Sequence, residues 1–296
     1  MIEIPISVGG WYELEKNGEL VASFPNIITD VGLDALASNA EDASLLNLCG
    51  LGAGTTPPEY ADTALESPLI STAMTSFIGG VVSSSTPYGQ YSQTDYTLAG
   101  RSGDFSYSEI GIITRSGALF SRSLIKDMLG NPTSLFVAAG ETLKIRYRLY
   151  KYPPPDDVIA TNHLVERRSG NTTHTVTIRP YGILEPSHPT SYWNGAARMS
   201  PSTATASTSN TPVQVTTIGE IAGSVDGSVV LQPYTAGSYE RVVSAVISGS
   251  AISSIGSILL GGSNKKSGWR CYFSPPIPMA TSATLTTTVK IKWMRY

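Results

Sequence analysis

Two segments of this chain alternate apolar and polar side chains from end to end. The first covers residues 141–150, and the second covers residues 283–296. Alternation with a period of two turns the apolar side chains of a β-strand to one face and the polar ones to the other. A proline-marked apolar stretch precedes each segment, at 130–137 and at 272–278. The sequence therefore predicts two β domains that each finish on a long strand with one buried face.

The length of the chain fits two such domains. Its 296 residues are many for one domain and enough for two, each with its own core. Three consecutive prolines and two aspartates at 153–157 predict a stiff, extended linker. We therefore expect an all-β chain of two tandem antiparallel β-sandwich domains, at 1–152 and 158–296, which fold separately when cut at the linker. The alternative is that the second domain completes the sheet of the first, so that each fragment would be left with an unpaired edge.

Turn and cap signals locate the elements between these strands. Asn17-Gly18 predicts a tight hairpin turn near the start of the chain. Thr29-Asp30 predicts the cap of one short helix, which would end near Asn39. A very short helix or turn is expected at 62–65, and a polar loop at 201–212. Further strands are expected at 45–51, 91–98, 106–113, 118–125, 134–138, 173–179, 214–218, 228–232, 242–247 and 255–260.

Charge is sparse in this chain. Only 15% of its residues are charged, against about 25% in ordinary soluble proteins. The surface must then be covered by small polar residues or by other subunits. A net charge of −3 without a long basic run argues against nucleic-acid binding. No apolar stretch approaches the ~20 residues that span a bilayer, and the N-terminus lacks the features of a signal peptide, so we expect assembly in a cytoplasm and no membrane insertion.

The cysteines and histidines do not predict a metal or cofactor. Cys49 and Cys271 each lie in an apolar, strand-like run, and we expect buried free thiols. The spacing of His163, His174 and His188 matches no local metal-binding motif, so we expect polar surface or loop histidines. A three-fold axis could gather one histidine from each of three subunits around a metal ion, and this alternative stays open.

Three patterns that resemble catalytic motifs lack the context that their chemistry needs. The glycine-rich run at 50–54 precedes Thr-Thr-Pro-Pro and not a helix, so a structural turn is expected in place of a phosphate loop. Ser123 and Lys126, with a Lys-Ser-Gly at 266–268, loosely match serine penicillin-recognising enzymes, but Ser123 lies in a strand-like segment. Glu109 and Asp127 lack the aromatic cleft of a glycosidase pair. We therefore expect no enzyme activity.

Aromatic residues in the second half are candidates for partner contact. Exposed tyrosine and tryptophan offer stacking faces for sugar rings and anchors for protein partners. The alternative is that these side chains cap the core of the second domain. The candidates, all beside glycine, proline or serine, are Tyr181, Tyr192, Trp193, Tyr234 and Tyr239.

The order of motifs from Asn26 to Tyr152 resembles that of tail-fibre, baseplate and collar proteins of tailed bacteriophages. It runs through a capped helix at 26–36, a glycine-rich strand end at 48–57, an Asp/Thr-Leu segment at 62–69, and strands at 108–112, 119–122 and 141–147. In the second half only the ending at 290–293 is similar. The resemblance implies a homo-oligomeric structural protein of the virion tail or neck, assembled in the host cytoplasm.

Two functional classes follow from these patterns. The first is a structural virion component, with a trimer as the expected oligomer, whose N-terminal half docks onto other tail or neck proteins and whose C-terminal half projects. The second is a receptor-binding module that holds a host-surface glycan or protein through the loop aromatics of the second half. Higher ring symmetries stay open for the first class.

Overall fold

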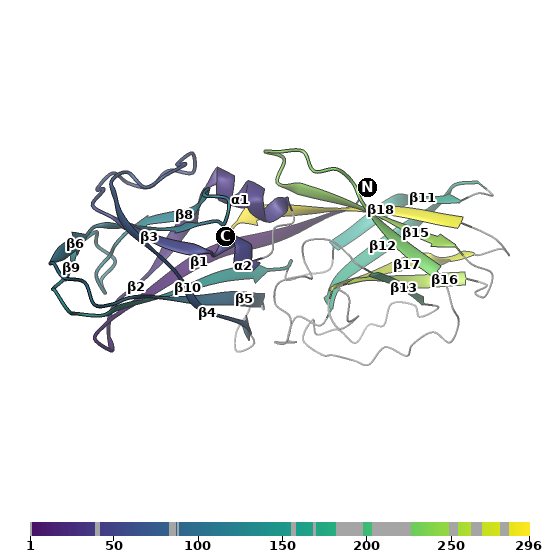
Figure 1. The fold of residues 1–296 in the computed structure, drawn as a ribbon. Coiled ribbons are helices and arrows are strands. Elements are labelled where there is room, and N and C mark those ends of the chain that lie inside the picture. Colours follow the sequence, from purple (N-terminus) through teal and green to yellow (C-terminus); the bar gives the residue numbers. More distant parts are fainter. Residues whose placement is uncertain are drawn as a thin grey trace.

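The computed structural model describes residues 2–38, 42–82, 87, 89–154, 158–167, 170–181, 198–202, 226–248, 254–261, 268–278 and 284–296. Within these ranges lie eighteen strands and two short helices, so the chain is all-β, as the alternating segments predict. The strands form two β-rich halves that lie end to end (Figure 1).

Eight strands of the first half close into an antiparallel barrel. The order is β1, β10, β5, β4, β3, β7, β8, β2 and back to β1. Closure removes free edges from the sheet. The strands are β1 (Ile2–Lys16), β2 (Glu19–Ile28), β3 (Leu48–Gly52), β4 (Pro68–Val82), β5 (Gly89–Leu98), β7 (Glu109–Ile113), β8 (Leu119–Leu124) and β10 (Leu143–Tyr152); β6 (Phe105–Tyr107) and β9 (Leu135–Val137) form a separate two-stranded sheet.

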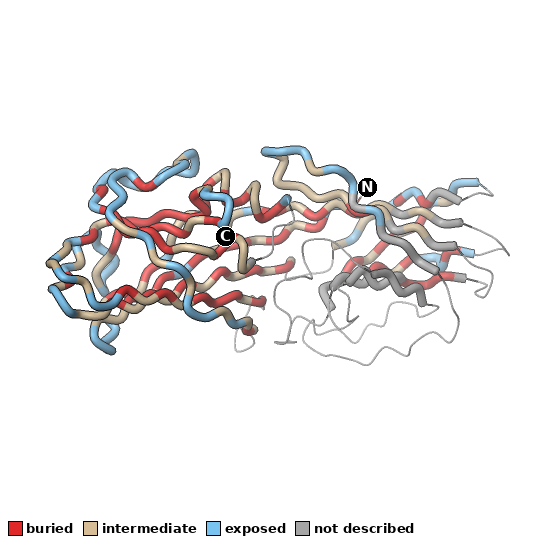
Figure 2. The backbone as a smooth tube through the Cα atoms, viewed as in Figure 1, coloured by how far each residue is buried: buried red, intermediate tan, exposed pale blue. Residues whose placement is uncertain are grey.

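The barrel differs from the sandwich that the sequence predicts for this half. The ten-residue pairing of β1 with β10 closes the ring. Period-two alternation is the same in a sandwich and a barrel, because both have one apolar face. The alternation itself is confirmed: along β10, Leu143, Ile145, Tyr147 and Leu149 are buried and their neighbours are not, apart from Lys151 near the strand end. Strand β1 alternates in the same way, whereas β8 is buried along its whole length (Figure 2).

The predicted cap and hairpin turn are confirmed. Helix α1 (Asp30–Ala37) begins after Thr29, whose hydroxyl accepts from the Gly32 amide at 2.9 Å and donates to the Leu119 carbonyl at 2.5 Å. A Cβ on Gly32 would lie 2.0 Å from the Phe120 carbonyl oxygen, so only glycine allows α1 to pack this closely. Asn17 and Gly18 both have positive φ. A second helix, α2 (Asp42–Leu45), was not predicted, and the segment 62–65, expected as a short helix or turn, is irregular with one bend at Ala64.

The second half is a further set of strands. Its pairing order is β14, β15, β18, β11, β12, β17, β16 and β13. Four of the expected strands are present, whereas the one at 214–218 and most of the expected loop at 201–212 lie outside the described residues. The bounds are β11 (Val158–Arg167), β12 (Thr172–Tyr181), β13 (Arg198–Ser202), β14 (Asp226–Leu231), β15 (Glu240–Ser248), β16 (Ser254–Gly261), β17 (Gly268–Pro278) and β18 (Thr284–Arg295).

Strand β1 belongs to both halves. Its residues 7–16 pair with β10 in the barrel, and its residues 2–8 pair in parallel with residues 289–295 of β18. Ile4 and its partner Ile291 are both buried in this junction. The division into domains at 153–157 stays a prediction. The shared strand favours the alternative in which cutting there leaves unpaired edges.

Truncation of Ile4 should destabilise the protein strongly. Ile4 is fully buried, and deleting its side chain leaves a cavity between the halves. We expect Ile4→Ala to lower the free energy of unfolding by about 2–5 kcal/mol in denaturant titration. The neighbouring Glu3→Ala removes a half-exposed partner of Lys290 and should cost no more than about 1 kcal/mol. Equal losses in the two variants would contradict a buried β1–β18 junction.

Candidate functional site

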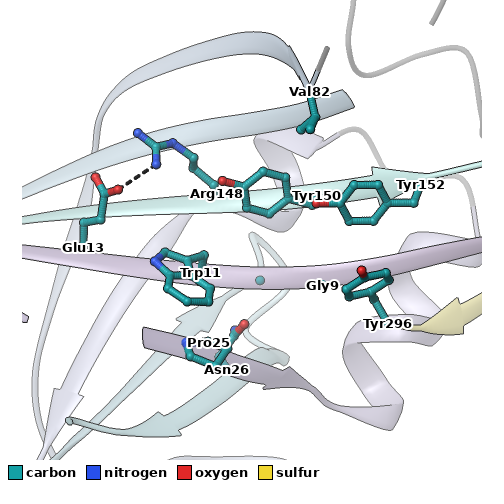
Figure 3. Close-up of a pocket in the computed structure, with 11 residues that line it drawn as sticks. Gly9, Trp11, Glu13, Pro25, Asn26, Val82, Arg148, Tyr150, Tyr152 and Tyr296 are labelled. Carbon is teal, nitrogen blue, oxygen red and sulfur yellow. Dashed lines mark hydrogen bonds and ion pairs between the residues drawn. The ribbon is translucent and has the colours of Figure 1, made fainter. Parts of the chain in front are cut away.

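A groove of about 620 Å³ runs over the outer wall of the barrel, across β1 and β10 (Figure 3). Successive side chains of a strand point to opposite faces, so the side chains of β1 and β10 that do not enter the barrel core point outward and form the walls of the groove. We call it the aromatic groove. Its lining residues are Gly9, Gly10, Trp11, Glu13, Pro25, Asn26, Val82, Arg148, Tyr150, Tyr152 and Tyr296.

Tyrosine rings form one side of the aromatic groove. The rings of Tyr150 and Tyr152 are nearly parallel, with an interplanar angle of 4° and centroids 6.0 Å apart. Figure 3 shows them side by side along β10, so both rings line the groove with parallel faces. The Tyr296 ring lies 4.8 Å from that of Tyr152 and is tilted by 37° to it. The aromatic surface therefore continues from β10 to the residue after β18.

Gly9 of β1 forms part of the floor of the aromatic groove and places no side chain there. A Cβ on Gly9 would meet only the Cβ and Cδ1 of Tyr296, at 3.5 and 3.9 Å, so the space above Gly9 is open. Tyr296 is held there by its backbone amide, which donates to the Val8 carbonyl at 2.8 Å. Opposite, the Trp11 indole is 37% exposed, and its Nε1 donates to the Ser23 hydroxyl at 2.8 Å.

Charges at the end of the groove are paired. The Glu13 carboxylate accepts from Arg148 at 2.7 Å and from Arg146 at 2.9 Å. Burial alone would raise the pKa of Glu13, but hydrogen bonds from Arg146 and Arg148 lower its pKa overall. Arg148 Nε also donates to Gln93 at 2.9 Å, and Arg146 Nε donates to Asp95 at 3.3 Å. The groove therefore carries fixed polar groups without a large net charge.

The Tyr152 hydroxyl at the groove stays protonated. Burial raises the pKa of Tyr152 to about 12, and the neighbouring Tyr150 and Tyr296 add to the effect. A neutral phenol both donates and accepts hydrogen bonds. Beneath the floor, the Asn26 amide donates to the Tyr147 hydroxyl at 3.2 Å, so Asn26 is engaged with the barrel wall. The groove thus combines flat apolar rings with neutral hydroxyl groups.

Two of the predicted partner contacts face the first half of the chain. The Tyr234 hydroxyl donates to the Asp34 carboxylate of α1 at 2.5 Å, and burial followed by this bond raises the pKa of Tyr234 to about 12. The Tyr239 ring lies 6.0 Å from the Arg295 guanidinium, which also binds Asp30. These tyrosines fasten the loop between β14 and β15 to α1. Their role in receptor contact stays a prediction.

The other three candidates have no described side chains. Tyr181 is the last residue of β12, in a strand and not in a loop. Tyr192 and Trp193 lie outside the described residues. The aromatic groove shares no residue with the predicted set. Its signal in the sequence was the pair Tyr150 and Tyr152, two aromatic residues on the polar face of an alternating strand.

The expectation of surface histidines is wrong for two of the three. His163 and His174 are both buried and face each other across β11 and β12. His174 Nδ1 lies 2.7 Å from the Pro275 carbonyl, to which it donates because a carbonyl oxygen only accepts, and Nε2 lies 2.8 Å from the Thr172 hydroxyl. Among the described residues no group of three or more His, Cys, Asp or Glu could hold a metal ion, and His188 lies outside them.

The acidic and nucleophilic candidates have structural partners. Glu109 is fully buried and accepts from Arg122 at 3.0 Å and from the amides of Gly54, Glu66 and Ser67. The glycine-rich run is thereby explained, because a Cβ on Gly54 would lie 2.6 Å from this carboxylate. Asp127 accepts from the amides of its own turn. Ser123 lies in β8, as predicted, and donates to backbone carbonyls.

The cysteines are buried free thiols, as expected, and burial raises the pKa of both Cys49 and Cys271. In the described part of the chain, neither helix has the length and apolar character needed to cross a membrane. Comparison of the chain with family models, curated proteins and solved structures finds no match.

His163 should make stability depend on pH. Burial lowers the pKa of His163 from 6.5 to about 4, with smaller contributions from the N-terminal charge and from His174. Between these values the unfolded chain binds the proton and the folded chain does not, so stability is full above pH 6.5 and falls as the pH drops toward 4. The loss amounts to about 3 kcal/mol at most.

The measurement is chemical unfolding at several pH values. His163→Gln should flatten the dependence of the unfolding free energy on pH between 6.5 and 4. The exposed neighbour Thr161 offers a control, since Thr161→Gln should leave the slope as in the unmodified chain. A slope that His163→Gln does not change would show that another group is responsible.

Loss of the Glu109 carboxylate should be costly. Glu109→Ala removes the buried carboxylate that accepts from Arg122 Nε and from three backbone amides, while Arg122 keeps its ion pair with Asp62 at 2.7 Å. We expect the unfolding free energy to fall by about 3–5 kcal/mol, the usual cost of breaking a buried ion pair. Glu15→Ala, which removes a partly exposed partner of Arg146 at 3.4 Å, should cost less than about 1 kcal/mol. A similar small loss for Glu109→Ala would refute its organising role.

Proposed function

We propose that this chain is a structural protein of a tailed-bacteriophage virion, located in the tail or neck and assembled as a homo-oligomer in the host cytoplasm. Two properties of the sequence support the proposal. The order of motifs over 26–152 resembles that of tail and collar proteins, and the 15% charged content leaves much surface for burial by neighbouring subunits. The chain acts without catalysis and without a cofactor.

The observation that carries the proposal is the shared strand. Pairing of β1 with both β10 and β18 joins the two halves through backbone hydrogen bonds. The contacts of Tyr234 and Gly237 with Asp34 add a second attachment. Such a molecule is suited to hold two ends at a fixed separation. In this proposal the half at 1–152 docks onto other virion proteins, and the half at 158–296, taken as a second β-sandwich body, projects.

Exposed apolar residues at the far end of the barrel support docking there. Leu129 is 86% exposed and Met128 is 60% exposed, on a turn that Asp127 rigidifies by accepting from two of its amides. Phe136 on β9 is also exposed. Apolar side chains on a stiff turn are favourable anchors for a partner protein, because little conformational entropy is lost on binding.

The oligomeric state and the location in the particle can be measured directly. We expect native mass spectrometry of the full chain to give a trimer, with six-fold or twelve-fold rings as the other symmetries consistent with the proposal. Antibodies against the chain should label the tail or neck of virions. A chain that is monomeric at high concentration and absent from particles would refute the proposal.

A second candidate function is receptor binding, favoured by the aromatic groove. The groove presents tyrosine and tryptophan rings on the barrel wall, where stacking and hydrogen bonding are both available. This function is compatible with the first, since a structural virion protein can also hold a ligand. It requires that an isolated molecule of the full chain bind a component of the host surface.

A further inference from the structure

We propose that the aromatic groove binds a neutral saccharide, with sugar rings stacked on Tyr150, Tyr152 and Tyr296 and with Trp11 on the opposite side. The proposal rests on the receptor-binding function and names its ligand class. It places the site on the first half of the chain, on the barrel wall, and not among the loop aromatics of the second half.

The shape of the groove fits flat rings. The Tyr150 and Tyr152 rings differ by 4° in orientation and lie side by side along the strand, so their faces are parallel where they line the groove (Figure 3). Sugar rings have apolar C–H faces that pack against aromatic faces, while their hydroxyls point to the sides. A volume of about 620 Å³ lies within the range of about 300–1,000 Å³ that is usual for small-molecule sites.

The polar groups of the groove fit hydroxyls and not charges. The raised pKa of Tyr152 keeps its phenol neutral, as a donor and an acceptor. At the end of the groove, Glu13 and Arg148 are joined at 2.7 Å, and Gln93 binds the same guanidinium. A charged ligand would have to compete with this ion pair. A neutral ligand with many hydroxyls can bind beside it without disturbing it.

The same features disfavour single-stranded nucleic acid, another ligand of aromatic grooves. Single-stranded nucleic acid also stacks on tyrosine, but its phosphates need a positively charged path, and Arg146 and Arg148 are already paired with Glu13. Proline-rich peptides also dock in aromatic-lined grooves, so a peptide of this kind is included among the probes below.

The first test is calorimetric titration of the full chain with defined probes. These are maltohexaose, cellohexaose, chitohexaose and mannohexaose, together with a decathymidylate and a decaproline peptide. We expect at least one hexasaccharide to bind, and Trp11→Ala and Tyr152→Ala each to weaken that binding tenfold or more. Tyr60→Ala, at an exposed aromatic residue outside the groove, should leave it unchanged.

A second variant fills the groove without removing an aromatic ring. Gly9 has space above it and no positive φ, so Gly9→Gln should fold and project its side chain over the floor. We expect it to weaken saccharide binding tenfold or more. Gly103→Gln is the matched control, because Gly103 also lacks a positive φ and a Cβ there would meet only Phe105, at 3.6 Å. Thermal unfolding of each variant checks that the fold is retained.

Three outcomes would overturn the proposal: no hexasaccharide binds, binding survives Gly9→Gln and Trp11→Ala in folded protein, or only the nucleotide or the peptide binds.

Incorporation into virions is a separate measurement that tests the structural function independently of saccharide binding. Gly9→Gln should enter virions as well as the unmodified chain does, because the groove variant leaves the docking surface intact. Loss of incorporation together with binding would show that the groove is an assembly contact and would contradict a saccharide site.

Discussion

The structure depends on the hydrogen bonding of one strand, β1, along both of its ends. Its C-terminal part closes the barrel by pairing with β10 and β2, and its N-terminal part pairs with β18. The side chains of Ile4 and Ile6 are buried at the junction. Backbone pairing and apolar burial therefore act in the same place, and the two halves of the chain share a strand although they are distant in sequence.

The aromatic groove is a consequence of that pairing. Because β18 runs parallel to β1, the chain leaves β18 beside Val8 and places Tyr296 next to Tyr152. The absence of a side chain at Gly9 keeps the floor between them open. The hydrogen bond from Tyr234 to Asp34 of α1 adds a second connection between the two halves. The site and the connection between the halves thus have one structural origin.

Local patterns predicted the local structure well. The alternation of β10, the Thr29 cap and the Asn17-Gly18 turn depend on neighbours in sequence, and each is confirmed. Barrel closure and the groove could not be predicted, because they depend on registers between strands far apart in the chain. The burial of His163 and Glu109 was missed for the same reason: their partners come from other elements.

Cleavage of the connection between the halves tests the shared strand most directly. A protease site inserted at 155–157, between the end of β10 and the start of β11, allows the folded chain to be cut after purification. If β1 pairs with β18 as described, the two fragments should remain together in size-exclusion chromatography without denaturant and separate only on unfolding. Fragments that separate at once and stay folded and soluble would contradict the account and support two independent domains.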